Sequence, residues 1–335
     1  MFVRFLGPIV FLLLVPMLTT AFGPIAAIGS ALLVPVVLVG SEFVFPGVRF
    51  DPNEPVSPSY RFLPLVYVPL QIGVTVWATW LAAQPAMDAL GFISLCIAVG
   101  VMAGLFGVLA AHELIHSHNR TEYALGVAML AAMSYPHFRI AHIYGHHRHA
   151  ASAKDPTTAR LGESFYAFVA RSLTAQLAAT WQHEVARGRF NRMWFDILGL
   201  PVLYVTVAAV FGWRGLAFFA LQSGLAILCL ALFDYVAHYG LVRRPGERLT
   251  DRHSWNASHA VCNAVLFNMG RHSDHHRKAA GPYQVLRRLD AGPELPAGYA
   301  GAMLLALIPP LWRRAMDGRV TTLMNEPGRA FTEAA

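Results

Sequence analysis

The sequence predicts an all-α integral membrane protein whose helices carry a histidine-rich, metal-binding region at their cytoplasmic ends. Hydrophobic residues make up 56% of the 335 positions and charged residues only 13%, a composition far from that of ordinary soluble domains. The chain also has 15 histidines, most of them in closely spaced groups. Neutral imidazole is a good ligand for transition metals, so these groups indicate a metal site.

Six apolar stretches are long enough to cross a bilayer as helices, which takes about 20 residues each. The first follows Arg4 and has no small-residue cleavage site, so we interpret it as a helix and not as a signal peptide. In the fourth, Gly100, Gly104 and Gly107 predict close contact with a neighbouring helix. The six predicted spans cover residues 5–22, 25–45, 62–84, 89–112, 194–212 and 215–238.

The distribution of the basic residues predicts how these spans are oriented across the membrane. With the N-terminus in the cytoplasm, the predicted external turns contain only Arg214 of the 26 lysines and arginines. This asymmetry follows the positive-inside rule, and it places both termini and the segments 113–193 and 239–335 on the cytoplasmic side. No repeat or second soluble domain is evident, so we expect one membrane domain, 1–335.

Residues 160–185 predict an amphipathic helix at the membrane interface. Arg171, Gln176 and Gln182 fall off its apolar stripe. The stripe consists of Phe165, Phe168, Val169, Leu173, Leu177 and Trp181.

Nine histidines are candidate metal ligands. Pairs four residues apart place both imidazoles on one face of an α-helix, and the predicted topology brings all nine to the same membrane edge. Nine ligands are too many for one ion and suit two, whereas we expect structural roles for the other six histidines. The candidates are His112 and His116 in HELIH, His142, His146 and His147 in HIYGHH, His238 in DYVAHYGL, and His272, His275 and His276 in RHSDHH.

Four carboxylates lie close enough in sequence to hold the outer nitrogen of a liganding imidazole. For each of them an ordinary ion pair with a nearby arginine is an equally good interpretation. The four are Glu113, Asp155, Asp234 and Asp274.

Other chemistries fit these residues less well. HELIH matches the H-E-x-x-H signature of zinc proteases, but a catalytic zinc takes three protein ligands and would leave most of the other histidines without a role. A metal transporter would hold its ligands near the membrane midplane. The isolated Cys96, Cys229 and Cys262 cannot build a rubredoxin-type or iron–sulfur centre within this chain.

The four boxes, in this order, resemble those of the integral-membrane alkane 1-monooxygenases. That family belongs to a histidine-rich diiron group with the xylene monooxygenases and the membrane fatty-acid desaturases. The resemblance covers about residues 60–325, and the HYG and RHSDHH elements favour the hydroxylase branch.

The resemblance implies that the nine histidines bind two iron ions. It further implies O₂-dependent hydroxylation of an unactivated C–H bond, most simply the terminal methyl of an n-alkane, giving a 1-alkanol. Electrons would come from a rubredoxin-type carrier and its NADH-dependent reductase, at a bacterial-type inner membrane. Alkyl-aromatic hydroxylation and fatty-acid desaturation remain alternative activities.

The sequence departs from the family pattern around the ligands. Ala141 stands where the family usually has Glu, Lys154 replaces the Glu of a Glu-Asp-Pro motif, and Asp234 and Ala237 replace Asn and Glu before the HYG element. No histidine is lost, so the departures leave the predicted iron ligands intact. They bear instead on the groups around the ligands and on the identity of the substrate.

Six basic residues of the predicted cytoplasmic face could dock an acidic electron carrier through electrostatic attraction. Contact with lipid headgroups explains them equally well. They are Arg243, Arg244, Arg248, Arg271, Arg277 and Lys278.

Overall fold

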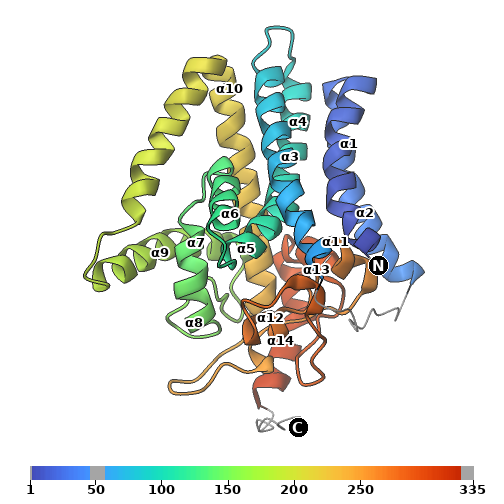
Figure 1. Cartoon of the computed structure of the whole chain (residues 1–335). Helices are drawn as coiled ribbons and strands as arrows, with labels where there is room; N and C mark the ends of the chain where they lie inside the picture. The colour runs from blue at the N-terminus through green and yellow to red at the C-terminus, as the bar shows by residue number, and fades with distance from the viewer. Residues whose placement is uncertain (1, 46–56, 326–335) are drawn as a thin grey trace.

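The computed structural model describes residues 2–45 and 57–325, and over those ranges its regular structure is helical (Figure 1). Five helical stretches are long and apolar enough to cross a membrane, in agreement with the predicted all-α membrane class. They are Val3–Phe22, Pro24–Val44, Ser59–Ala82, Ala89–Ile115 and Met193–His238. The long helices within them are α1 (Gly7–Phe22), α2 (Ile28–Val44), α3 (Pro58–Ala82), α4 (Ala89–Met102) and α10 (Met193–His238).

Most of the shorter elements lie around and below the lower ends of these long helices in the view of Figure 1. Two of them, η3 (Ala103–Gly107) and η4 (Ala141–His146), are π-helical. The remaining α-helices of the described ranges are α5 (Val108–Ile115), α6 (Arg120–Ala132), α7 (Phe138–Ile140), α8 (His147–His149), α9 (Phe165–Ala186), α11 (Ala260–Val265), α12 (His272–Arg277), α13 (Tyr299–Ala306) and α14 (Pro309–Asn325).

The 46-residue helix α10 covers both of the last two predicted spans. It is broken at Gly212, whose φ of 68° and ψ of −173° lie outside the helical region. Such a positive φ costs glycine little and other residues more, so Gly212 allows the change of direction. Figure 1 shows the chain turning back at the top of α10, so that His238 ends the descending half.

Helix α4 and the π-helical turn η3 that continues it approach α10 closely through glycines, as predicted. A Cβ atom on Gly104 would lie 2.5 Å from the carbonyl oxygen of Ala226, and one on Gly100 would lie 2.9 Å from that of Gln222. Larger side chains at these two positions would push the helices apart. This contact joins the helix that leads to the HELIH box to the helix that ends in His238.

Helix α9 packs differently from the apolar stripe expected of it. Phe165 and Phe168 are buried as predicted, but further along the helix the buried positions include Gln176 and Glu184, while Leu177 is half exposed. Gln176 is buried because its side-chain oxygen accepts a hydrogen bond from the Tyr135 hydroxyl. Gln176 therefore belongs to the buried face of α9, although it falls off the predicted apolar stripe.

Candidate metal centre

The first histidine box lies where α4 continues into α5 through the π-helical turn η3. In this turn the backbone N–H of Val108 bonds to the carbonyl of Ala103, five residues earlier. π-Helical turns are often found at functional sites, because one extra residue rotates everything that follows. His112 on α5 is buried, and His116, at the C-terminal cap of α5, is partly buried.

The second box lies in η4, and its helical type decides which histidines meet. The N–H of His147 bonds to the carbonyl of His142, five residues earlier. In an α-helix, residues five apart point about 140° away from each other. In the π-helical turn the Nε2 atoms of His142 and His147 come within 2.9 Å, while His146 turns towards a different set of histidines.

The remaining four histidines come from the end of α10 and from α12. His238 is the last residue of α10, and its side chain is fully buried. His272 and His276 lie four apart on α12 and face the same way, with Nε2 atoms 3.1 Å apart. His275 on the same short helix points to the other group.

The nine imidazoles therefore form two groups. The five-histidine cluster contains His112, His116, His142, His147 and His275. The four-histidine cluster contains His146, His238, His272 and His276, all of them buried.

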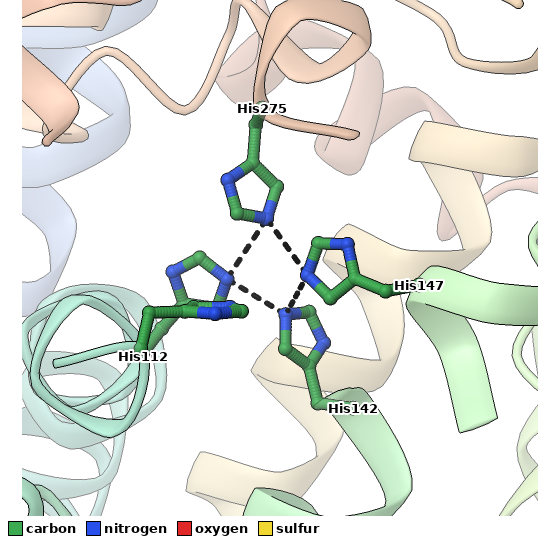
Figure 2. A group of neighbouring side chains, drawn as sticks. His112, His142, His147 and His275 are labelled. Atoms are coloured by element: carbon green, nitrogen blue, oxygen red, sulfur yellow. Dashed lines mark hydrogen bonds between the residues drawn. The ribbon is translucent and has the colours of Figure 1, made fainter. Parts of the chain in front are cut away.

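Figure 2 shows four members of the five-histidine cluster with their ring nitrogens turned inward. The Nε2 atom of His112 lies 2.7 Å from that of His142 and 3.1 Å from that of His275. The Nε2 atoms of His275 and His147 are also 3.1 Å apart. His116 completes the group, with its ring centroid 4.8 Å from that of His112.

In the four-histidine cluster, three Nε2 atoms form a triangle. The His238–His272, His238–His276 and His272–His276 distances are 3.1, 3.2 and 3.1 Å. A neutral imidazole's Nε2 either carries a hydrogen or offers a lone pair, so three mutual contacts cannot all be hydrogen bonds. A cation that accepts every lone pair removes this conflict.

The distances fit the same conclusion. Two nitrogen ligands about 2.1 Å from one transition-metal ion and at right angles to each other are about 3 Å apart. The contacts between cluster nitrogens span 2.7 to 3.2 Å. Burial and the neighbouring imidazoles also lower the pKa of His142, His147, His272, His275 and His276, so these rings stay neutral, as metal ligands must.

Two outer hydrogen bonds fix rings of the four-histidine cluster. The Nδ1–H of His238 donates to the backbone carbonyl of His253 at 2.9 Å, which leaves its Nε2 with a free lone pair. The Nδ1 of His146 lies 2.9 Å from Oδ2 of Asp155. Burial disfavours the charged form of both side chains, but their mutual attraction and hydrogen bond outweigh it. The pKa of Asp155 is therefore lowered and the pKa of His146 is raised.

Comparison with known proteins agrees with this geometry. The fatty acid desaturase family model matches residues 88–304. Alkane 1-monooxygenase 1 of Pseudomonas aeruginosa is 40% identical over a 277-residue alignment that covers 78% of this chain and 72% of that protein. Alkane 1-monooxygenase 2 of Alcanivorax borkumensis is 36% identical over 74% of this chain and 69% of its own length.

The chain belongs to the alkane 1-monooxygenase family. A more distant similarity joins it to the xylene/toluene monooxygenase hydroxylase component of Pseudomonas putida, at 27% identity over 63% of this chain and 59% of that protein. The family resemblance expected from the four histidine boxes is confirmed.

In this family member, one of the four predicted carboxylates touches a cluster ring. Asp155 holds His146, and the hydroxyl groups of Thr157 and Thr158 in turn donate to its two oxygens. Glu113 accepts a hydrogen bond from the backbone N–H of Tyr283. Asp274 accepts one from the N–H of Arg287, and Asp234 lines a pocket.

Sequence reasoning missed two partners of the cluster. The Thr157 hydroxyl lies 2.9 Å from Nδ1 of His146, and only its place two residues after Asp155 could have indicated this. No sequence pattern could have indicated the carbonyl of His253, because every residue has a backbone carbonyl group. The six histidines for which structural roles were expected lie outside both clusters.

An apolar pocket reaches both clusters. His112 and His142 of the five-histidine cluster and His272 of the four-histidine cluster line it, together with Asp234. Its other walls come from η3, α5, α7, α10 and the turn that follows α11. The larger apolar side chains among them are Leu105, Leu109, Phe138, Leu230, Phe233 and Met269.

Proposed function

We propose that this protein hydroxylates the terminal methyl group of n-alkanes with O₂, giving 1-alkanols. The observation that carries the proposal is an apolar pocket that ends at two histidine clusters, in a chain of the alkane 1-monooxygenase family. A hydrocarbon has no polar group to recognise, so a site for it needs apolar walls and a reactive end. The pocket provides both.

The nine clustered histidines would hold two iron ions, one in each cluster. Bound iron would supply the redox chemistry that activates O₂ towards a C–H bond. The protein's own contribution is to fix the rings. His238 is held by the His253 carbonyl and His146 by Asp155, and such outer contacts commonly change metal affinity by about 10–100-fold.

The pocket walls orient the substrate and keep water from the reacting end. Leu109 and Phe138 lie beside cluster histidines, and Phe138 stacks on His142 with ring centroids 4.8 Å apart. A straight chain lying along these side chains would present one terminal carbon to the imidazole-lined end. Dry walls also strengthen every electrostatic interaction at that end.

The reaction needs electrons that this chain does not store. One oxygen atom enters the alkane and the other leaves as water, which takes two electrons and two protons. We propose a rubredoxin-type carrier and NADH-dependent reductase as the source. The exposed Arg244, Arg248, Arg277 and Lys278, together with the partly exposed Arg243, offer a docking face for an acidic carrier. Arg271 is buried and does not belong to it.

We further propose six spans in a bacterial-type inner membrane, with both termini in the cytoplasm and one domain over residues 1–335. The break at Gly212 supports counting α10 as two spans, 194–212 and 215–238. Both clusters would then lie at the cytoplasmic edge, where His238 ends the last span. The basic residues lie mostly on that side.

The two clusters argue against the zinc-protease alternative. A single zinc at HELIH would use His112 and His116 and would give no role to the separate four-histidine cluster. A xylene-type hydroxylase would use the same clusters, and the similarity to the xylene/toluene enzyme keeps that activity as a second candidate.

The test is product analysis with isotopically labelled oxygen. The purified protein, loaded with ferrous iron and supplied with carrier, reductase and NADH, is given a series of n-alkanes and p-xylene under ¹⁸O₂. We expect 1-alkanols carrying one ¹⁸O atom. A product formed only from p-xylene would favour the second candidate, and no oxygenated product from a protein with full iron content would contradict both.

A further inference from the structure

Asp234 is the one carboxyl group among the residues that line the apolar pocket. The pocket's other polar side chains are His112, His142 and His272, which belong to the clusters. Asp234 lies on α10 four residues before His238, hence one helical turn away on the same face. Its neighbours Phe233 and Tyr235 are buried, whereas Asp234 keeps partly accessible surface and lines the pocket.

Asp234 forms no hydrogen bond or ion pair with any residue that the structure describes. Other buried carboxylates have partners. Asp155 contacts His146 and two threonine hydroxyls, and Asp196 is paired with Arg139 at 2.7 Å. A carboxyl group left unpaired in apolar surroundings is costly, so the missing partner of Asp234 is a feature to be explained.

We propose that Asp234 binds the hydroxyl group of a chain held in the pocket. An oxygen of Asp234 can accept the hydrogen of an alcohol whether or not the carboxyl group is itself protonated. A pure hydrocarbon leaves this group unpaired, and sites built to hydrogen-bond a hydroxyl discriminate strongly against analogues that lack it. The ligand class is therefore a straight chain with a hydroxyl group at its cluster end.

This inference rests on the proposed function, because the reaction's own 1-alkanol has that hydroxyl at that end. It predicts that the pocket binds a 1-alkanol more tightly than the n-alkane of the same length. The product would then compete with the alkane for the pocket. Asp234 acts here as a specificity-determining residue.

The experiment measures binding, not turnover. Iron-loaded full-length protein in nanodiscs is titrated with radiolabelled 1-decanol and with n-decane, and the ratio of the two dissociation constants is compared among variants. Partition of each ligand into lipid is the same for every variant and cancels in that comparison. Asp234→Leu removes the hydrogen-bonding group, Asp234→Asn keeps one, and Met269→Leu is a control on the pocket wall.

We expect Asp234→Leu to lower the preference for 1-decanol by about tenfold or more, the effect of losing one hydrogen bond to such a group. Asp234→Asn should keep most of the preference, and Met269→Leu should change both affinities alike. An unchanged ratio in Asp234→Leu overturns the inference. So does a loss of iron from both Asp234 variants, which would assign the carboxyl group to the metals.

A failure of the proposed function would give a different result from a failure of the inference about Asp234. Wild-type protein that binds both ligands and holds iron, but makes no alkanol from alkane, would contradict the proposed reaction. The binding ratio would still report on Asp234.

Discussion

At the scale of single residues, the best-defined support of the site is the contact between Asp155 and His146. The carboxylate is buried and receives hydrogen bonds from Thr157 and Thr158 while it holds Nδ1 of His146. These contacts fix the ring so that its Nε2 points at His276, 3.2 Å away. Removing the carboxylate should therefore loosen one ligand of the four-histidine cluster without removing the ligand itself.

We predict that Asp155→Asn weakens iron binding by about 10–100-fold. An amide group at this position has one acceptor oxygen, and the hydroxyl groups of two threonines already compete for it. The measurement is the chelator concentration that removes half of the bound iron, with the exposed Asp290→Asn as control. Equal chelator concentrations for the Asp155 variant and the wild type would show that this contact does not support the metal.

At the scale of secondary-structure elements, the long apolar helices and the nine histidines could be predicted from sequence, but the division of the histidines could not. His142/His146 and His272/His276 have the same spacing, which suggests the same pairing. The second pair shares a cluster because it lies on α-helix. The first pair is divided because η4 is π-helical and brings His142 to His147. Histidine spacing alone did not reveal a π-helical turn.

The contact of η3 with α10 leads to a prediction about stability. A methyl group on Gly104 would meet the Ala226 carbonyl at 2.5 Å and Cβ of Cys229 at 2.6 Å. Gly104→Ala should lower the free energy of unfolding by about 1–3 kcal/mol, the usual cost of overpacking. Gly224→Ala, also in a helix but with open space around it, should be neutral or stabilising. Thermal denaturation in detergent compares the two, and equal melting temperatures would argue against close packing at Gly104.

A second prediction concerns the junction of α9 and α10. The buried Glu184 accepts hydrogen bonds from Arg187 and from the backbone and side chain of Arg192. Although burial opposes the charge, these contacts lower the pKa of Glu184 to about 2 from an ordinary 4.5. The stabilisation is therefore complete above pH 4.5 and is lost as the pH falls towards 2.

Glu184→Gln should accordingly destabilise the protein by about 1–3 kcal/mol at neutral pH. The difference between variant and wild type should shrink below pH 4.5. Melting temperatures of both proteins at pH 7 and pH 3 check this. A difference that is the same at both pH values would mean that the carboxylate charge is not what stabilises the junction.

At the scale of the whole molecule, the fold separates three environments. Apolar helices surround a pocket, and the pocket ends at the two clusters. Exposed basic residues follow two of the cluster histidines in the sequence: Arg244 and Arg248 come after His238, and Arg277 and Lys278 come after His276. Under the proposed function, a hydrocarbon would enter from lipid while electrons would arrive from the aqueous side. This separation would account for an apolar pocket and exposed basic residues in one chain of 335 residues.

The basic surface gives a prediction about the electron carrier. Reversing two exposed charges, Arg244→Glu together with Lys278→Glu, should raise the KM for an acidic carrier several-fold at low salt and leave kcat at saturating carrier unchanged. The effect should fade at high ionic strength because salt screens exposed charges. Steady-state kinetics at two salt concentrations measure this. An unchanged KM would favour lipid headgroups as the partners of these residues.

The binding of two iron ions by nine imidazoles is tested by the metal content of the purified protein. Elemental analysis should find two irons per chain in the wild type. It should find about one in His275→Ala or in His238→Ala, which each disturb one cluster, and two in the exposed His118→Ala control. One zinc per chain, or an iron content that none of the cluster substitutions lowers, would contradict two-iron binding.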